Sequence, residues 1–170
     1  GRSRGLGAGS GRAYPPRVAH VPTPRPNEPL FTLRPSWIEV GRTANTVYYA
    51  HDDDVLIVVP QPGSHDDGAT ARENVSFQMG HARQLGRRIA TVVLLGRLVA
   101  QDADARRAYA DGMNPELCFG SALVVTNPLS RAIGSFFLGL SKPRIPTKMV
   151  ESVDQAVAWL DTLRGSGAAR

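Results

Sequence analysis

Strand-like and helix-like segments alternate regularly from residue 71 to the end of the chain. Residues 91–95 and 122–126 are continuous apolar runs of the kind found in strands buried on both faces, and residues 147–150 form a shorter β-prone segment. Each is followed by apolar residues at helical spacing. Alternating strands and helices favour parallel pairing with right-handed crossovers. The sequence therefore predicts an α/β fold.

The predicted helices have identifiable start signals. Thr70 and Glu73 fit a capping box before a helix over 71–88, and Ser152 with Gln155 fits a second one before the last helix. Asn127 is placed to cap a helix whose first residue is Pro128. These signals predict four helices in all, over 71–88, from Asp102 or Asp104 to about Gly112, over 128–140 and over 152–163.

The segment before the first helix is predicted to be extended. Residues 37–40, 47–50 and 55–59 are β-prone, and the charged residues 51–54 lie between two apolar runs, which indicates a hairpin. Residues 60–68 are expected to form a loop. We therefore expect a single mixed, mostly parallel sheet with an N-terminal β-hairpin and about four helices.

Charge and proline content separate the first 36 residues from the rest. This segment holds seven of the thirteen prolines and six arginines against one acidic residue, so it carries the whole formal charge of +5. Proline and glycine disfavour helices and sheet ladders. We expect a disordered tail or linker over residues 1–36, a domain over 37–164 and a frayed end over 165–170. Residues 37–170 together carry no net charge.

Composition also restricts the class of protein. With 42% hydrophobic residues the chain is not wholly disordered, and it lacks the apolar run of roughly 20 residues that a membrane helix needs. Cys118 is the single cysteine, which excludes an internal disulfide framework. The arginine-rich tail lacks the interleaved aromatic residues of a base-stacking surface. No specific nucleic-acid partner is predicted, although association through the tail stays an alternative.

No catalytic or metal motif stands out. The stretches 51–54 and 65–67 contain histidine and aspartate, but neither matches a known metal loop, so a solvated turn and loop are favoured. Cys118 lies between apolar neighbours, as a core residue does. The chain has neither a Gly-x-Ser-x-Gly nor a phosphate-loop motif. We predict no catalytic residue, no bound metal and no cofactor.

The stretch from Val47 to Leu163 resembles the STAS/SpoIIAA-like family, in its bacterial branch of small STAS-SEC14-type domains. The N-terminal hairpin contributes to the resemblance, and three further segments carry it: residues 104–109, 123–131 and 154–160. The last of these, an acidic residue followed by a small-residue helix with a Trp-Leu pair, is the most telling.

The resemblance implies a regulatory or protein-interaction module in the cytoplasm rather than an enzyme. In relatives of this type, a serine or threonine at the start of the helix after the central strand is phosphorylated by a partner kinase. The matching stretch here, residues 96–104, has neither, so no phospho-switch is expected. Asp102 and Asp104 would either mimic a permanent negative charge there or simply cap the helix.

Six residues are the candidates for interaction or ligand binding. Three arginines stand near the ends of helices that follow strands, where open α/β sheets bind ligands, and the other three lie in stretches that the resemblance points to. The six residues are Asp102, Asp104, Arg106, Arg107, Asn127 and Arg131. The leading hypothesis is a protein partner. The alternative is a SEC14-like module that binds a lipid or a small anion, with an apolar groove beside Phe136, Phe137 and Leu140.

Overall fold

The computed structural model describes residues 33–167. Of the predicted tail, residues 1–32 lie outside the described residues and 33–36 are described. Residues 168–170 of the predicted frayed end also lie outside them. In chain order the elements are β1 (Ile38–Arg42), β2 (Thr46–Ala50), β3 (Val55–Pro60), β4 (Ser64–Asp66), α1 (Gly68–Leu85), β5 (Ile89–Leu94), the 3₁₀ turn η1 (Leu95–Arg97), β6 (Leu98–Gln101), α2 (Ala103–Gly112), β7 (Cys118–Val124), α3 (Pro128–Leu140), β8 (Thr147–Val150) and α4 (Val153–Gly167).

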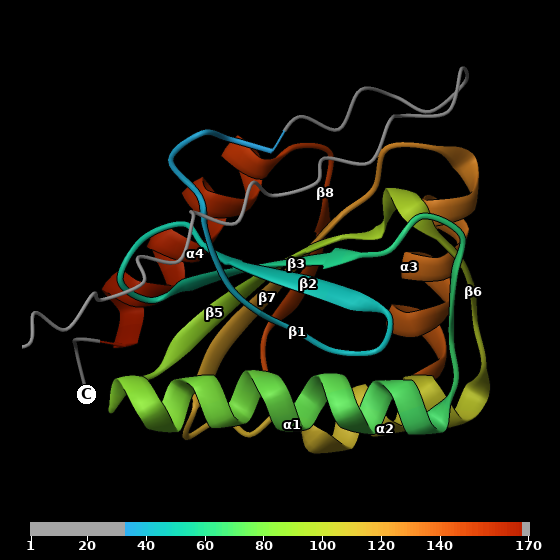
Figure 1. Ribbon diagram of the computed structural model, residues 1–170, viewed down its shortest axis with the longest axis horizontal. Coiled ribbons are helices and arrows are strands. Elements are labelled where there is room, and N and C mark those ends of the chain that lie inside the picture. Colours follow the sequence, from blue (N-terminus) through green and yellow to red (C-terminus); the bar gives the residue numbers. More distant parts are fainter. Residues whose placement is uncertain (1–32, 168–170) are drawn as a thin grey trace, which may run out of the picture. The chain divides into compact units, whose positions relative to one another are not determined.

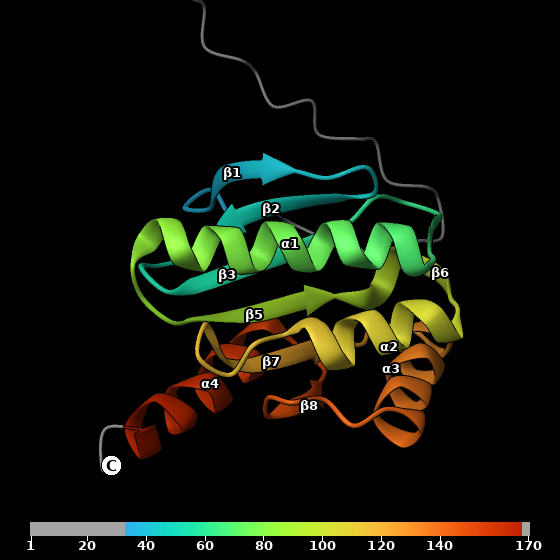
Figure 2. The ribbon, with the colours of Figure 1, turned by 90° about the horizontal axis from the view of Figure 1, so that it is seen from below.

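Six strands form one mixed sheet in the order β1-β2-β3-β5-β7-β8, which can be followed from top to bottom in Figure 2. The pairs β1–β2 and β2–β3 are antiparallel, while β3–β5, β5–β7 and β7–β8 are parallel. The predicted fold class, a mostly parallel mixed α/β sheet with four helices, is confirmed. The parallel strands follow from the helical crossovers between them.

The helices lie on both faces of this sheet. In Figure 1, α1 and α2 run along one face and α4 lies across the other. The central strand β3 is buried along its whole length, as its continuous apolar sequence predicts for a strand covered on both sides. Helix α3 is different, because it packs beside η1, β6 and β8 at one end of the molecule. None of the helices in residues 33–167 is long and apolar enough to cross a membrane.

A second, two-stranded parallel sheet was not predicted. It consists of β4 and β6 and lies in segments that we expected to be loop and helix start. Within it, Asp66 is the register partner of Gln101, and the Asp102 amide donates to the Asp66 carbonyl at 3.0 Å. This small sheet holds the start of α1 beside the start of α2.

The start of α1 also differs from the prediction. The N-cap is Asp67, whose side chain accepts from the Thr70 amide at 2.8 Å, while the Thr70 hydroxyl accepts from the Asp67 amide at 3.0 Å. The capping box is therefore Asp67 with Thr70, and the predicted box of Thr70 with Glu73 is wrong. Since Asp67 caps better than an interior threonine, the helix gains its first turn from Gly68 onward.

Three further boundaries are shifted. Helix α1 ends at Leu85 because Gly86 takes the left-handed conformation at φ 64°, which glycine adopts without strain. Strand β7 begins earlier than predicted, at Cys118. Helix α4 continues to Gly167, so residues 165–167, which we expected to fray, are helical.

Cys118 is fully buried, and this burial raises its pKa to about 11, which suits a core thiol rather than a nucleophile.

The chain before β1 is fixed to the domain by Trp37. Its indole is buried, and the indole nitrogen donates to His51 Nδ1 at 2.9 Å. Arg34 lies over the Trp37 ring and also pairs with Asp154 of α4 at 2.7 Å. Residues 33–37 therefore belong to the folded part, several residues before the predicted domain start.

Candidate functional site

A cavity of about 70 Å³ lies between the sheet, β6, α2 and α3. Most of its wall is apolar and comes from strand ends, from η1 and β6, and from the inner side of α3. These apolar residues are Val93, Leu95, Leu98, Leu123, Ile133 and Phe137. A concave, mainly apolar cavity with a few polar groups is the usual form of a small-molecule site.

The polar part of the wall includes the two register partners of the small sheet. Asp66 and Gln101 both line the cavity, and residues in register on neighbouring strands project to the same face. Asp66 is 5% exposed. The side-chain oxygen of Gln101, Oε1, is also buried and accepts no hydrogen bond within residues 33–167. A buried acceptor without a donor lowers the stability of a fold, so the burial of this oxygen requires an explanation.

Asp66 belongs to a polar cluster that we define as Asn45, Asp66, Thr70, Asn74 and Tyr109. Oδ1 of Asp66 accepts from Asn45 at 2.7 Å and from Thr70 at 3.1 Å, and Oδ2 accepts from the Tyr109 hydroxyl at 3.0 Å. Asn74 donates to both Tyr109 and Asn45, at 2.9 and 3.0 Å. The cluster therefore joins the β1–β2 loop, β4, α1 and α2 through neutral donors to one carboxylate.

Burial governs the protonation of this cluster. Desolvation raises the pKa of Asp66 above its ordinary value, although hydrogen bonds from Asn45, Tyr109 and Thr70 oppose that shift. Desolvation also raises the pKa of Tyr109 well above the usual tyrosine value, with the nearby Asp66 charge adding to the effect. No ion pair between Asp66 and a basic side chain occurs in the described part of the chain.

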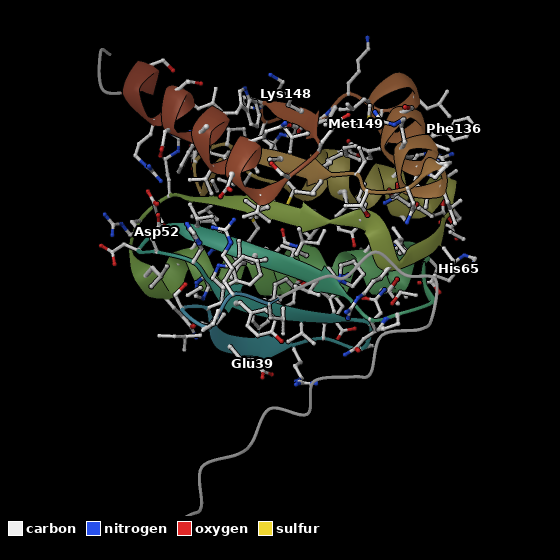
Figure 3. The ribbon with its side chains drawn as sticks, turned by 90° about the horizontal axis from the view of Figure 1, so that it is seen from above. Glu39, Asp52, His65, Phe136, Lys148 and Met149 are labelled. Carbon is white, nitrogen blue, oxygen red and sulfur yellow. The ribbon has the colours of Figure 1, made fainter. Side chains whose placement is uncertain are left out.

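The outer side of α3 is the second unusual feature. Leu129, Phe136 and Leu140 are 48%, 59% and 67% exposed, while Ile133 and Phe137 on the inner side are buried. Figure 3 shows Phe136 at the outer margin of the molecule. Spacings of seven and four residues place the three exposed side chains on one stripe of the helix. The predicted amphipathic face is thus only half covered by this domain.

The SEC14-like alternative expected one apolar groove beside Phe136, Phe137 and Leu140. In the structure these three side chains do not line one groove. Phe137 is 8% exposed and lines the cavity, whereas Phe136 and Leu140 are mostly exposed and are not part of the cavity wall. The helix therefore separates two surfaces, one facing the cavity and one facing solvent.

The four candidates at the start of α2 have local structural partners. The Asp102 carboxylate caps the helix by accepting from the Ala105 amide at 2.9 Å. Asp104 pairs with Arg107 one turn later, and Arg106 donates to the Gln101 carbonyl at 3.1 Å. The Asp102 carboxylate is thus engaged in capping, which is the simpler of the two roles considered for it.

The two candidates at the start of α3 are also engaged. Asn127 accepts from the Ser130 amide at 2.7 Å and donates to the Gly96 carbonyl at 3.0 Å, so it joins the helix cap to η1. Arg131 pairs with Glu151 at 3.2 Å. The prediction that Asn127 caps this helix ahead of Pro128 is confirmed.

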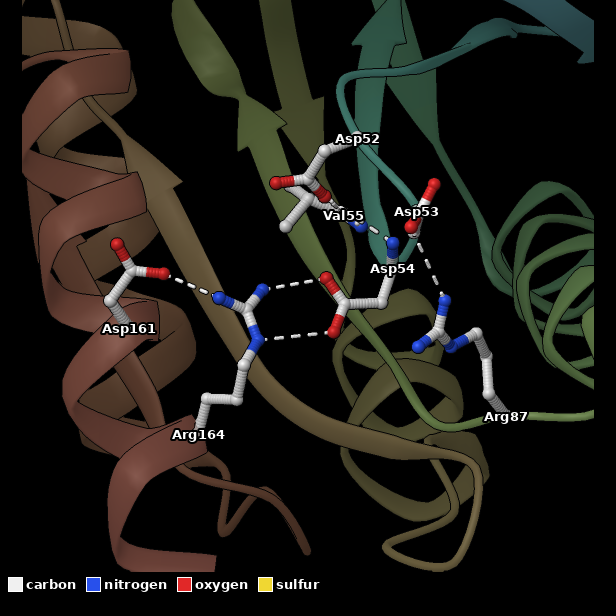
Figure 4. A network of polar contacts seen from close by, with 7 residues as sticks. All are labelled: Asp52, Asp53, Asp54, Val55, Arg87, Asp161 and Arg164. Atoms are coloured by element: carbon white, nitrogen blue, oxygen red, sulfur yellow. Dashed lines mark hydrogen bonds and ion pairs between the residues drawn. The ribbon is translucent and has the colours of Figure 1, made fainter.

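The two stretches of histidine and aspartate lie far apart. Figure 3 shows Asp52 and His65 near opposite ends of the sheet. Within residues 33–167, no three His, Cys, Asp or Glu side chains gather in a way that could hold a metal ion. The Asp52 carboxylate instead accepts from the Val55 amide at 3.0 Å, and Asp54 pairs with Arg164, as Figure 4 shows. This stretch therefore organises a turn.

Asp66, Gln101 and Tyr109 were not predicted to form a site, and Asp66 was considered only as a metal ligand within the stretch 65–67. They lie in three different elements, and Asp66 and Tyr109 are 43 positions apart in the chain. The one local signal was an acidic residue directly before the Asp67 helix cap.

A family model described as "Domain of unknown function (DUF7793)" matches residues 48–164, from β2 to near the end of α4. No curated protein matches the chain. Because the matched part is more than half of the chain, the protein belongs to the DUF7793 family.

Proposed function

We propose that this domain is a STAS-like regulatory module that binds a protein partner and has no catalytic role of its own. The observation that carries the proposal is the exposed stripe of Leu129, Phe136 and Leu140 on α3. Val99, on the neighbouring strand β6, is also 47% exposed. Contiguous apolar surface that faces solvent is typical of an interaction site.

The chemistry of the stripe fits a protein surface. It presents one large aromatic and two leucine side chains on a helix, in the spacing by which amphipathic helices are recognised.

The proposal does not rest on the sequence candidates, because they have local structural partners. Asp102 and Asn127 accept hydrogen bonds from helix amides, and Arg131 is paired. The stretch 96–104 contains no serine or threonine, so the proposed module works without a phosphate switch at that place. We place its action in the bacterial cytoplasm, where such modules contact their partners.

Affinity capture with matched surface variants tests the proposal. Phe136→Ser removes the largest exposed side chain of the stripe, and Ile38→Ser is the control, since Ile38 is 70% exposed on β1. Both substitutions should leave stability within about 0.5 kcal/mol because both side chains are mostly exposed. We expect a cellular protein that the unmodified chain and Ile38→Ser retain and Phe136→Ser loses. Retention of the same proteins by all three chains would contradict the proposal.

A further inference from the structure

Two side chains in the wall of the cavity, Asp66 and Gln101, have hydrogen-bond acceptor positions that are not filled within residues 33–167. Gln101 Oε1 is buried and accepts no hydrogen bond within residues 33–167. Asp66 Oδ1 accepts from two donors, but Oδ2 accepts only from Tyr109 in the same part of the chain. Since a carboxylate offers about four acceptor positions, one on Oδ2 is still open.

The two residues that carry these acceptors are neighbours on adjacent strands. Asp66 and Gln101 are register partners on β4 and β6, and both contribute to the cavity wall. The Asp66 carboxylate is buried among neutral donors, and no basic side chain pairs with it in the described residues. A cation at this place would meet a carboxylate that forms no ion pair with a basic side chain of residues 33–167.

Most of the remaining wall is apolar, although Thr46, Ser121 and Thr147 also line it. Leu95, Leu98, Leu123, Ile133 and Phe137 surround the remaining space, and the cavity measures about 70 Å³. That volume has room for roughly five water-sized groups. It suits a short hydrocarbon chain and is too small for a lipid tail. The buried negative charge also disfavours the small anion that sequence reasoning considered.

We propose that this cavity binds a small primary alkylammonium ion, with its N–H groups donating to Asp66 Oδ2 and Gln101 Oε1 and its short alkyl chain packed against Ile133 and Phe137. The ammonium supplies the donor that Gln101 Oε1 lacks and a second donor for Asp66 Oδ2. Charge-assisted hydrogen bonds to a buried carboxylate are strong. Ile133 and Phe137 belong to α3, whose outer side carries the exposed stripe. The ligand therefore contacts the same helix as the proposed protein partner, from the other side.

Three probes of equal size distinguish the chemistry. Butylammonium, butan-1-ol and propionate have the same number of non-hydrogen atoms and differ in the charge of the polar group. Titrated into the full chain at neutral pH and followed by amide NMR, butylammonium should bind saturably and shift the resonances of Leu95, Ile133 and Phe137. Butan-1-ol should bind at least about tenfold more weakly, since it forms no charge-assisted bond, and propionate should not bind.

Two variants test the residues. Gln101→Leu should weaken butylammonium binding about tenfold while leaving the fold at least as stable, because it removes a buried acceptor without a donor. Asp66→Asn should weaken binding at least as much, and Asp161→Asn, at an exposed carboxylate on α4, should leave it unchanged. If Asp66→Asn does not fold, Gln101→Leu alone decides the matter, because that substitution removes no hydrogen bond.

The proposal is overturned if butylammonium shifts none of the cavity resonances, or if butan-1-ol or propionate binds as tightly as butylammonium. It is also overturned if Gln101→Leu binds the probe as the unmodified chain does. Selective, Gln101-dependent binding of butylammonium establishes the site.

Discussion

Arg164 of α4 donates two hydrogen bonds to the carboxylate of Asp54, from Nε at 3.1 Å and from Nη2 at 2.6 Å. Asp54 lies directly before β3, so this contact joins the last helix to the β2–β3 hairpin. The Asp54 side chain is only 16% exposed, and the contact raises the pKa of Arg164. Arg164 also lies over the Phe119 ring on β7. A paired geometry of this kind restrains the side chains of both partners.

Removing this contact should lower stability by about 1 kcal/mol, at the upper end for partly exposed ion pairs. The measurement is urea denaturation of Arg164→Met. The matched control is Arg87→Met, because Arg87 meets the largely exposed Asp53 at 3.7 Å and should contribute nothing measurable. Figure 4 shows both pairs. Equal losses in the two variants would contradict this assignment.

Gly120 on β7 is required by the close approach of α4. A Cβ at this position would lie 2.6 Å from Leu163 Cδ1 and 3.0 Å from Leu160 Cδ2. We expect Gly120→Ala to destabilise the fold by about 1–3 kcal/mol through overpacking. Gly80→Ala, in the middle of α1 with open space around the added carbon, should stabilise it by about 0.5–1 kcal/mol. Thermal denaturation of the two variants should thus shift in opposite directions.

Asn127 joins the start of α3 to η1 through its amide group. Asn127→Ala should cost about 1–2 kcal/mol, since it removes both the helix cap and the bond to the Gly96 carbonyl. Asn127→Ser keeps a capping oxygen and should cost less. If both variants were as stable as the unmodified chain, Asn127 would have no structural role. It would then again be a candidate interaction residue.

The neighbouring residues Asp66 and Asp67 should make opposite contributions to the pH dependence of stability. Burial raises the folded-state pKa of Asp66, so its unfavourable contribution is present at neutral pH and disappears as the pH falls from that raised pKa toward the ordinary value. The Thr70 amide lowers the pKa of Asp67, whose favourable contribution is lost as the pH falls from the ordinary value through the lowered one.

Urea denaturation across acidic pH measures both effects. The stability of the unmodified chain relative to Asp66→Asn should increase as the pH falls through the first range. Its stability relative to Asp67→Asn should decrease in the second range. The same trend in both comparisons would show that the assigned causes of the two shifts are wrong.

The fold class follows from the sequence because its signals are local and repeated. The runs at β5 and β7 and the cap at Asn127 each specify their own element. The small sheet could not be found in this way, because β4 has only three residues and β6 follows directly on a 3₁₀ turn. Strands this short show no periodicity of their own.

The site escaped prediction for a related reason. The site forms only when β4, β6 and α2 pack together and bring Asp66, Gln101 and Tyr109 into one place. The spacing of these residues along the chain does not predict that they meet. The exposed stripe was visible as a pattern, since Leu129, Phe136 and Leu140 belong to the predicted apolar face of residues 128–140. Its exposure depends on α3 lying at the end of the sheet, which only the tertiary structure gives.

The proposed partner-binding role is tested most directly by a photo-activated cross-linking amino acid placed at position 136 of the full chain in living cells, with position 38 as the control. Both side chains are more than half exposed. Contact through α3 predicts a discrete cross-linked protein at position 136 that is absent at position 38. No cross-link at position 136, or the same products at both positions, would contradict a role for the α3 stripe in partner binding.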